Sequence, residues 1–571
     1  MHLNFYCLLF FVLAITTKST YTASTFIKSP DSTTSIGNEF FEKTEFLIRL
    51  KIPDTVSHLF TTTEKDIKQE ISLLSLLDNK FWKENIMREI IPSEMFFAFD
   101  DNIVSIKSFS DILNTNKSKS SVMSLNSTIT DHFIKLVELQ TVLKNIDITQ
   151  HIHFNGFEAI KASLDLNYFN TLKLNPFIAD IDTNEKFQAF NAVLNLYEDK
   201  EEEEEENFEE EEFPNLSIQY NAPRHLARMS RRYKIEKENE DELQYYYKND
   251  ALGTNVSVYI LDTGISIEHP QIVGRARHGA SFVKEGMGDF NGHGSHVAGI
   301  VGSTEYGVCK ECELVEVKCL NKNGQGDLTT VISAIEFAVS DMLKNKKKAV
   351  ANLSLGSFRS KILNEAVRAA TDNGLVFVVA AGNNNMNACM NSPASEPVAI
   401  TVGAIDDESD LIASFSNWGE CVDIFASGIR VESISHRDYK NSIKFSGTSM
   451  ATPSVAGLAA ILLDSGIPAD QIKDKLIELS SKNMIRRRNL FSRPRTPNRL
   501  LFNGVSSKYN DYNSALEENL IGENIYDFLN QTLTNDECQI SDVPIQEILK
   551  KRDDWSEPSF NDLQKLVDLT H

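Results

Sequence analysis

Three widely separated segments of the chain carry side chains suited to nucleophilic catalysis. Asp262 ends the apolar run VSVYILD, His293 stands between glycines in NGHGSH, and Ser449 follows a Gly-Thr turn at the start of an apolar stretch of small residues. A serine hydroxyl is a weak nucleophile near neutral pH, and a histidine oriented by a carboxylate can take its proton. Together these residues could therefore attack an acyl bond, such as the peptide bond of a protein.

Each segment also has a purely structural interpretation when it is taken alone. Asp-Thr-Gly could be a turn, and a lone histidine or serine more often serves packing than chemistry. His296 lies one helical turn after His293 and gives an H-x-x-H pattern, but the adjacent glutamate of the zinc motif H-E-x-x-H is missing. We therefore do not expect a metal at these histidines.

The elements that must position these side chains follow an alternating pattern. Apolar runs without polar alternation, separated by helical stretches, predict a parallel sheet covered by helices on both faces. Functional residues of such sheets lie at the carboxyl ends of strands, where Asp262 stands. The expected strands are 256–262, 314–320, 349–356, 375–382 and 398–404, and the expected helices are 295–301, 328–343, 360–372 and 449–463.

The three segments resemble the signature sequences of one enzyme family. LDTGI, GHGSHVAG and SGTSMATPSVAGLAA are similar to the Asp, His and Ser segments of the subtilases, in the order that this family shows. The similarity extends from NAPRHLARMS through AAGNNN, SPASEP and SFSNWG to TPNRLLFNG, and it is greatest to the proteinase K branch. The resemblance implies a subtilisin-type serine endopeptidase of the α/β class, with a mostly parallel sheet, helices on both faces and a small α+β prodomain in front.

The resemblance also assigns roles to individual residues. Asp262, His293 and Ser449 would form the catalytic triad, and the Asn383 amide and the Ser449 backbone N–H would bind the oxyanion. Substrate would lie as an added strand against two backbone edges. These edges are Ser354, Leu355 and Gly356 on one side and Gly324 to Gly326 on the other, with cleft walls that predict broad acceptance of apolar and aromatic side chains.

Two further features come from the same resemblance. Cys389 and Cys421 occupy the positions of a disulfide in related enzymes. A structural calcium ion would be held by the carboxylate of Asp423 and the carbonyl oxygens of Pro397 and Ala399. The chemistry itself needs no cofactor. Cys309, Cys312 and Cys319 could form a bridge, stay free thiols or provide a weak metal site, and the pairing of Cys538 is left open.

The chain divides into several expected regions. An apolar stretch from Phe5 to Ile15 is too short to span a bilayer and predicts a signal peptide over 1–23 and a secreted protein. Residues 24–213 would be a propeptide: 45–187 resembles a subtilisin-type inhibitor prodomain, with apolar residues at helical spacing over 157–172. The acidic run 198–212 would be a linker. The peptidase domain would cover 214–504, and 505–571 is an extension without an assigned role.

The charge distribution limits the expected partners. The formal net charge is −24, and residues 198–212 contain twelve acidic side chains and one lysine. Such a charge argues against nucleic acid as a partner, and no later segment is long enough to anchor the protein in a membrane. We expect a monomer that acts on proteins or peptides, with its own propeptide as inhibitor and cleavage between about 207 and 217. A binding element for a basic or metal partner is the alternative for the acidic run.

Three other protein classes compete with the subtilase interpretation of these residues. An aspartic protease would need Asp464-Ser-Gly in an active-site loop, but Gly466 and Pro468 mark the end of a helix there. An α/β-hydrolase orders its triad Ser, acid, His, and His571 is the sole histidine after Ser449. A catalytically silent binding protein on a protease scaffold stays open, although the complete set of expected catalytic residues argues against it.

Overall fold

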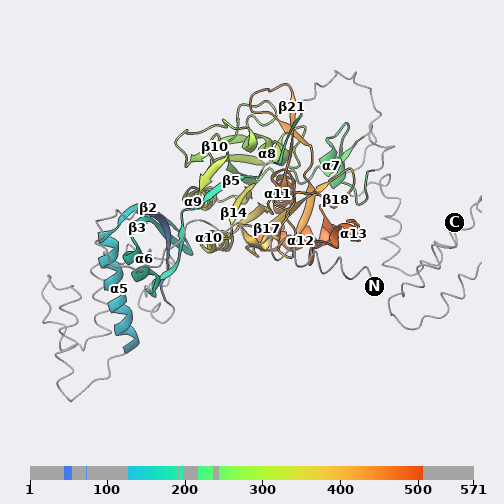
Figure 1. The fold of residues 1–571 in the computed structure, drawn as a ribbon. Helices are drawn as coiled ribbons and strands as arrows, with labels where there is room; N and C mark the ends of the chain where they lie inside the picture. Colours follow the sequence, from blue (N-terminus) through green and yellow to red (C-terminus); the bar gives the residue numbers. More distant parts are fainter. Residues whose placement is uncertain are drawn as a thin grey trace, which may run out of the picture.

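The computed structural model describes residues 44–53, 73, 127–190, 192–196, 216–235 and 243–505. These residues form a smaller body, made of 44–53 and 127–183, and a larger body, made of 216–235 and 243–505 (Figure 1). Two short strands, β5 (Lys186–Ala189) and β6 (Ala192–Leu196), continue from the smaller body onto the larger one. The predicted signal peptide, the acidic run and the C-terminal extension lie outside the described residues.

A mostly parallel sheet forms the centre of the larger body and confirms the predicted α/β class. Its strand order is β10-β11-β9-β13-β15-β17-β19-β23-β22, and β18 pairs with β17. The strands are β10 (Ala276–Ser281), β11 (Glu313–Lys318), β9 (Val256–Asp262), β13 (Lys348–Leu353), β15 (Leu375–Ala380), β17 (Ile400–Asp406), β18 (Leu411–Ile412), β19 (Ile424–Ser427), β22 (Ser481–Lys482) and β23 (Arg499–Leu500). β18 and β22 pair antiparallel to their neighbours, and every other pairing in this sheet is parallel.

Two hydrophobic cores lie on opposite faces of this sheet. β9 is buried along its whole length, with Val258 and Ile260 facing one core and Tyr259 and Leu261 facing the other. The first core contains α8 (His293–Gly302) and α11 (Thr448–Asp464), and the second contains α9 (Leu328–Asn345) and α10 (Lys361–Asp372). Burial on both faces explains the continuous apolar runs of the sequence.

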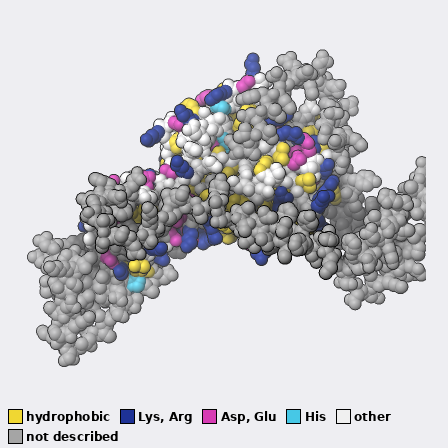
Figure 2. Space-filling view, in the orientation of Figure 1, with side chains coloured by type: hydrophobic (Ala, Val, Ile, Leu, Met, Phe, Trp, Pro, Cys, Tyr) yellow, Lys and Arg dark blue, Asp and Glu magenta, His cyan; other side chains and the backbone are white. Residues whose placement is uncertain are grey.

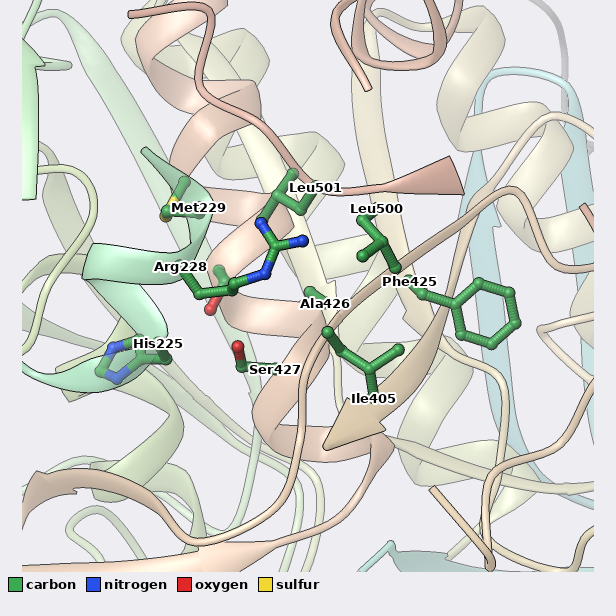
Figure 3. Close-up of a pocket in the computed structure, with 10 residues that line it drawn as sticks. His225, Arg228, Met229, Ile405, Phe425, Ala426, Ser427, Leu500 and Leu501 are labelled. Carbon is green, nitrogen blue, oxygen red and sulfur yellow. The ribbon is translucent and has the colours of Figure 1, made fainter. Parts of the chain in front are cut away.

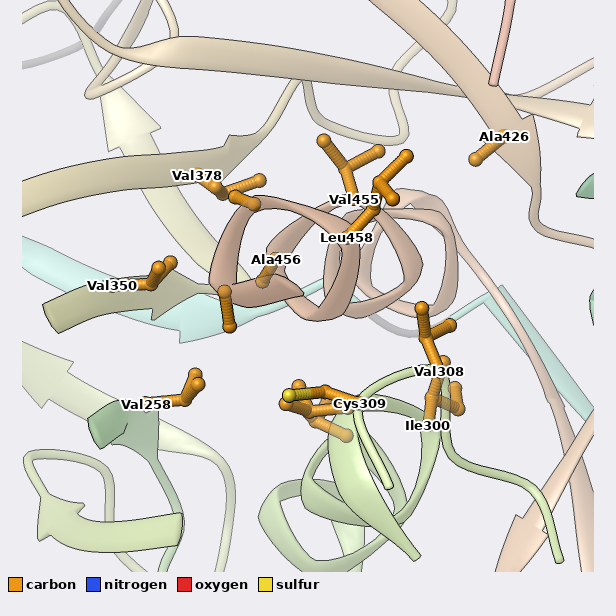
Figure 4. Close-up of a cluster of buried hydrophobic side chains, with 14 of the residues drawn as sticks. Val258, Ile300, Val308, Cys309, Val350, Val378, Ala426, Val455, Ala456 and Leu458 are labelled. Atoms are coloured by element: carbon orange, nitrogen blue, oxygen red, sulfur yellow. The ribbon is translucent and has the colours of Figure 1, made fainter. Parts of the chain in front are cut away.

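The helix α11 runs through the middle of the larger body. Side chains from strands and from α8 surround it in Figure 4, and 15 of its 17 residues are buried. Its small residues allow this close packing: a Cβ atom on Gly457 would lie 2.7 Å from the Cβ atom of Val308. The short helices α7 (Arg224–Met229), α12 (Ile472–Leu479) and α13 (Arg487–Leu490) pack at the periphery.

The smaller body is a four-stranded antiparallel sheet with two helices. The strand order is β2-β3-β1-β4, formed by β2 (Asp147–Phe154), β3 (Phe157–Leu164), β1 (Thr44–Leu50) and β4 (Ile178–Thr183). The helices are α5 (Ser127–Asn145) and α6 (Leu166–Lys173). Strand β2 contacts α9, and β4 contacts α10.

The helical spacing that we identified over 157–172 is wrong in its first half. Residues 157–164 form β3, the strand between β2 and β1 in the sheet. Ala159 packs toward the larger body, and Ile160 packs into the core of the smaller one. The strand is thus apolar on both faces, and its sequence lacks the alternation that identifies an exposed strand.

Cysteine pairing is defined for the described part of the chain. Cys389 and Cys421 form a disulfide with a Cα–Cα distance of 5.4 Å. Cys309, Cys312 and Cys319 are buried free thiols, and Cys538 lies outside the described residues. Burial raises the pKa of Cys309 and of Cys319, so these thiols are poor nucleophiles.

The face of the larger body in Figure 2 carries basic and acidic side chains interspersed. Residues 198–212, whose twelve acidic side chains and one lysine supply less than half of the net charge of −24, lie outside the described residues. No helix among the described residues is long and apolar enough to cross a membrane.

Replacing both Cys389 and Cys421 by serine should lower the free energy of unfolding by roughly 3 to 4 kcal/mol, because the disulfide restricts a 32-residue loop in the unfolded chain. Urea denaturation of the double variant and of the parent chain measures the difference. An unchanged midpoint in oxidised protein would contradict this account of the disulfide.

Candidate active site

Asp262 and His293 form a fully buried pair at the carboxyl end of β9, an interior strand of the sheet. Asp262 is the last residue of β9, and His293 is the first residue of α8. The Nδ1 atom of His293 lies 2.7 Å from Oδ1 of Asp262, and both side chains are 0% exposed. Among the described residues, neither Oδ2 of Asp262 nor Nε2 of His293 has a hydrogen-bond partner. The Nε2 atom is thus available to a neighbouring hydroxyl.

The loop before His293 is organised by a second carboxylate. Oδ1 of Asp289 accepts hydrogen bonds from the Thr263 hydroxyl and the Gly292 N–H, and its Oδ2 accepts from both the N–H and the hydroxyl of Ser295. Gly292 has a φ of +106°, which L side chains rarely adopt. A glycine is therefore needed where the chain turns into α8.

Ser449 is the second residue of α11, which packs against α8. Its hydroxyl donates to the carbonyl oxygen of Ser354 over 2.9 Å, and the Ser354 hydroxyl donates to the carbonyl oxygen of Ser449 over 3.0 Å. His293 and Ser449 thus stand at the amino ends of two packed helices. The hydroxyl points to Ser354 in this structure, and a rotation about its Cα–Cβ bond is needed to direct it elsewhere.

Asn383, which follows β15, presents its amide N–H to a backbone carbonyl. Its Oδ1 accepts hydrogen bonds from the Thr448 N–H and hydroxyl, each over 2.9 Å, and these two contacts orient the amide. Its Nδ2 donates to the carbonyl oxygen of Phe190 over 2.9 Å. A Cβ atom on Gly447 would lie 2.5 Å from this oxygen, so glycine is needed for its approach.

The segment that delivers Phe190 lies as a strand between two edges of the larger body. Strand β5 pairs antiparallel with both β12 (Gln325–Asp327) and β14 (Leu355–Phe358). At the end of the strand, the Ala189 N–H donates to the Gly324 carbonyl over 3.0 Å, and the N–H of the next residue, Phe190, donates to the Ser354 carbonyl over 3.3 Å. All five residues expected to bind substrate belong to these two edges: Gly324, Gly326, Ser354, Leu355 and Gly356.

The Phe190 side chain lies in a buried pocket beside Gly356. Phe190 is 7% exposed, and a Cβ atom on Gly356 would lie 2.7 Å from the Cζ atom of its ring. A Cβ atom on Gly382 would lie 3.7 Å from the same atom, which is an ordinary contact distance. The pocket thus has room for an aromatic ring because position 356 is a glycine.

The chain is paired again immediately beyond this point. Strand β6 lies antiparallel to β21 (Ser442–Ser446), which also pairs with β20 (Val431–Ile434). His296 connects this hairpin to α8, because its Nε2 lies 3.1 Å from the Val431 carbonyl and 3.0 Å from the Ile443 carbonyl. Burial lowers the pKa of His296 to about 3, so the ring is neutral near pH 7. Its role here is structural, and no metal-binding group of His, Cys, Asp and Glu occurs among the described residues.

The oxygens expected to hold calcium surround a lysine instead. Nζ of Lys473 lies 2.8 Å from Oδ2 of Asp423, 2.7 Å from the Pro397 carbonyl oxygen and 2.8 Å from that of Ala399. The ammonium group supplies the positive charge that a calcium ion would supply at this point, and it donates hydrogen bonds to these oxygens. With Lys473 present, the oxygen set does not fit a metal ion.

A separate pocket lies between α7 and the far strands of the sheet (Figure 3). His225, Arg228 and Met229 line it from α7, and Ile405, Phe425 and Leu501 line it from the other side. Arg228 is committed to a buried ion pair with Asp410, with hydrogen bonds of 2.8 and 2.9 Å. None of the residues that line this pocket is among the residues described above around His293, Ser449 and Asn383.

The sequence patterns missed three residues that organise the active site, Asp289, Thr448 and Phe190. They also missed Lys473, which contacts the oxygens expected to hold calcium. Asp289 and Thr448 lie inside the motifs but have the character of ordinary loop and helix residues. Lys473 lies on an amphipathic helix, where a lysine is typical of a solvated face. Phe190 follows a four-residue strand without any motif, and its role depends on pairing with segments more than one hundred residues away.

Comparison with known proteins agrees with the class that the fold and the site define, an α/β serine hydrolase acting on peptides. Residues 253–497 match the model of the subtilase family. The chain is 46% identical over 380 residues to the subtilase-type proteinase RRT12 of Saccharomyces cerevisiae, covering 64% of this chain and 77% of that protein. It is 41% identical to the subtilisin-like serine protease Rho m 2.0101 of Rhodotorula mucilaginosa, covering 51% and 88%.

A crystal structure of a cold-adapted subtilisin-like serine proteinase is 37% identical and covers 50% of this chain and 98% of its own, with a TM-score of 0.44. On the strength of the family and sequence matches, the chain belongs to the subtilase family and is a subtilisin-like serine endopeptidase. Enzymes of this family need no cofactor for catalysis.

The Lys473→Met variant should be less stable by about 1 to 3 kcal/mol, because the Asp423 carboxylate and two carbonyl groups lose their shared donor. Thermal unfolding with and without excess chelator measures the effect. The control is Lys475→Met on the same helix, whose lysine forms an exposed pair with Glu478. A chelator that lowers the parent midpoint as far as Lys473→Met does would contradict the assignment of Lys473 as the cation of this site.

Proposed function

We propose that this protein is a secreted, self-inhibited zymogen whose mature form hydrolyses peptide bonds through Asp262, His293 and Ser449. The proposal rests on a segment of the same chain, β5 and Phe190, that lies as a strand between β12 and β14. The Phe190 carbonyl oxygen accepts a hydrogen bond from Nδ2 of Asn383 over 2.9 Å. A peptide bound in this way has its carbonyl oxygen where an oxyanion would need a donor.

The reaction would follow the course that the three side chains allow. Ser449 Oγ attacks the scissile carbonyl carbon while Nε2 of His293 takes its proton. Asp262, hydrogen-bonded to Nδ1, holds the tautomer and stabilises the imidazolium. The proton then passes to the leaving amine, and water hydrolyses the acyl-enzyme. Attack requires the Ser449 hydroxyl to turn from Ser354 toward His293.

The oxyanion would be stabilised by an amide that is already oriented. Thr448 fixes Oδ1 of Asn383 through two hydrogen bonds, so the Nδ2 donor needs no reorganisation when charge develops. Such preorganised donors account for a large share of catalysis in water-excluded sites. The Ser449 backbone N–H is proposed as the second donor.

Specificity would be broad, with a preference for aromatic and apolar residues before the scissile bond. Gly356 leaves room for a ring, as the buried Phe190 side chain illustrates. Backbone pairing with β12 and β14 supplies affinity that does not depend on sequence.

Self-inhibition would use the smaller body as a prodomain. Gln150 Nε2 donates to the Ser333 hydroxyl over 2.6 Å, and the His153 N–H donates to Glu336 over 2.9 Å, both on α9. The Ser360 hydroxyl, at the start of α10, donates to Asp182 over 2.8 Å. These contacts would hold β5 in the cleft after cleavage. Export by residues 1–23 and a propeptide within 24–213 complete the proposal.

Ser449→Ala should retain its prodomain, because the nucleophile of self-cleavage is missing. The mature parent enzyme should react with a fluorophosphonate at Ser449, which mass spectrometry locates. Normal maturation of Ser449→Ala would show that another protease makes the cut. A processed parent protein that stays unlabelled would favour a silent scaffold.

Asn383→Ala should slow self-cleavage about a hundred- to a thousandfold, the loss that removal of the equivalent donor causes in a subtilisin. Refolding from denaturant, followed by gel analysis over time, gives the rate constant. The matched control is Asn384→Ala, whose side chain is exposed and neighbours the same loop. Equal rates for the two variants would remove Asn383 from the mechanism.

A further inference from the structure

We infer that the bond between Phe190 and Asn191 is the first bond that this active site cleaves in its own chain, and that the acidic run 198–212 stays on the peptidase. The inference rests on the proposed function and specifies its intramolecular substrate. It moves the first cut upstream of the region 207–217, which the charge pattern of the sequence favours.

Both backbone polar groups of Phe190 form hydrogen bonds to residues at the catalytic site. Its carbonyl oxygen accepts from Nδ2 of Asn383 over 2.9 Å. Its N–H donates to the Ser354 carbonyl oxygen, which also accepts the Ser449 hydroxyl over 2.9 Å. The Ser449 hydroxyl and the Phe190 N–H therefore share one acceptor, which keeps Ser449 Oγ beside the backbone of Phe190.

Strand pairing holds the chain on both sides of this bond. Residues 186–189 pair with β12 and β14, and residues 192–196 pair with β21, where Ala192 lies opposite Ser446. A chain anchored in this way before and after one peptide bond has the arrangement of a bound substrate. The edge of β21 would accordingly bind the residues that follow a scissile bond in other substrates as well.

The acidic run is a poor alternative for this first cut. Phe208 is the sole apolar side chain in residues 198–212. The pocket that holds Phe190 is buried, and a carboxylate would lose hydration there without gaining a positive partner. A cut at Phe208 would also require β5 and β6 to leave their pairing.

Cleavage of the Phe190–Asn191 bond would be a hydrolysis in two stages. Ser449 Oγ bonds to the Phe190 carbonyl carbon, the bond to the Asn191 nitrogen breaks, and His293 passes the serine proton to that nitrogen. Water then cleaves the ester, which leaves a carboxylate on Phe190 and restores the hydroxyl. The smaller body would remain bound as a product inhibitor, while β6 and the acidic run stay covalently joined to the peptidase.

The test is the N-terminal sequence and mass of the first fragments from refolding parent chain, quenched early. We expect a peptidase fragment that begins at Asn191. Phe190→Asp should slow this cut at least a hundredfold, whereas the linker control Phe208→Asp should leave its rate within about twofold. A fragment that begins within 207–217 and forms at the parent rate in Phe190→Asp would overturn the inference.

A peptide assay removes any effect of folding. The peptide KFQAFNAVLNL, which copies residues 186–196, should be cut by processed parent enzyme between Phe and Asn. Cleavage at another bond, together with another first N-terminus, would also overturn the inference. A cut at another bond that still depends on Ser449 would rule out the Phe190–Asn191 bond and leave the proposed function intact. Cleavage of refolding Ser449→Ala at the parent rate would rule out the proposed function.

Discussion

The site depends on one hydrogen bond that has no access to solvent, between Oδ1 of Asp262 and Nδ1 of His293. A buried carboxylate is costly unless it is paired, and this bond supplies the partner while it fixes the imidazole. β9 must end and α8 must begin at the same place for the bond to form. Gly292 and Asp289 meet this requirement, since they shape the loop that leads into α8.

The sequence predicted the frame of this arrangement well. Strands buried on both faces leave continuous apolar runs, so five strands of the parallel sheet and its four main helices were predicted to within a few residues. The strands β10 and β19 were not predicted. The catalytic candidates lie in local motifs at strand and helix ends, where turn chemistry demands glycine. The segment 157–164 was predicted less well, because a strand covered on both sides lacks any alternation that separates it from a helix.

Features that depend on long-range pairing were beyond the sequence. Nothing in the four residues of β5 indicates that it lies between β12 and β14, or that Phe190 meets Asn383. Lys473 approaches Asp423 from helix α12, and its sequence pattern is that of a surface lysine. In both cases the role depends on the surface that the residue meets. The short strand β5 pairs with β12 and β14, and the Lys473 ammonium group contacts three oxygens.

In the proposed zymogen the chain occupies its own active site as a substrate, with Phe190 at the catalytic residues. A crystal structure of uncut Ser449→Ala would test this arrangement. We expect the Phe190 carbonyl oxygen within hydrogen-bond distance of Nδ2 of Asn383, with Nε2 of His293 facing position 449. A cleft filled by another segment, or His293 turned away from Asp262, would contradict it.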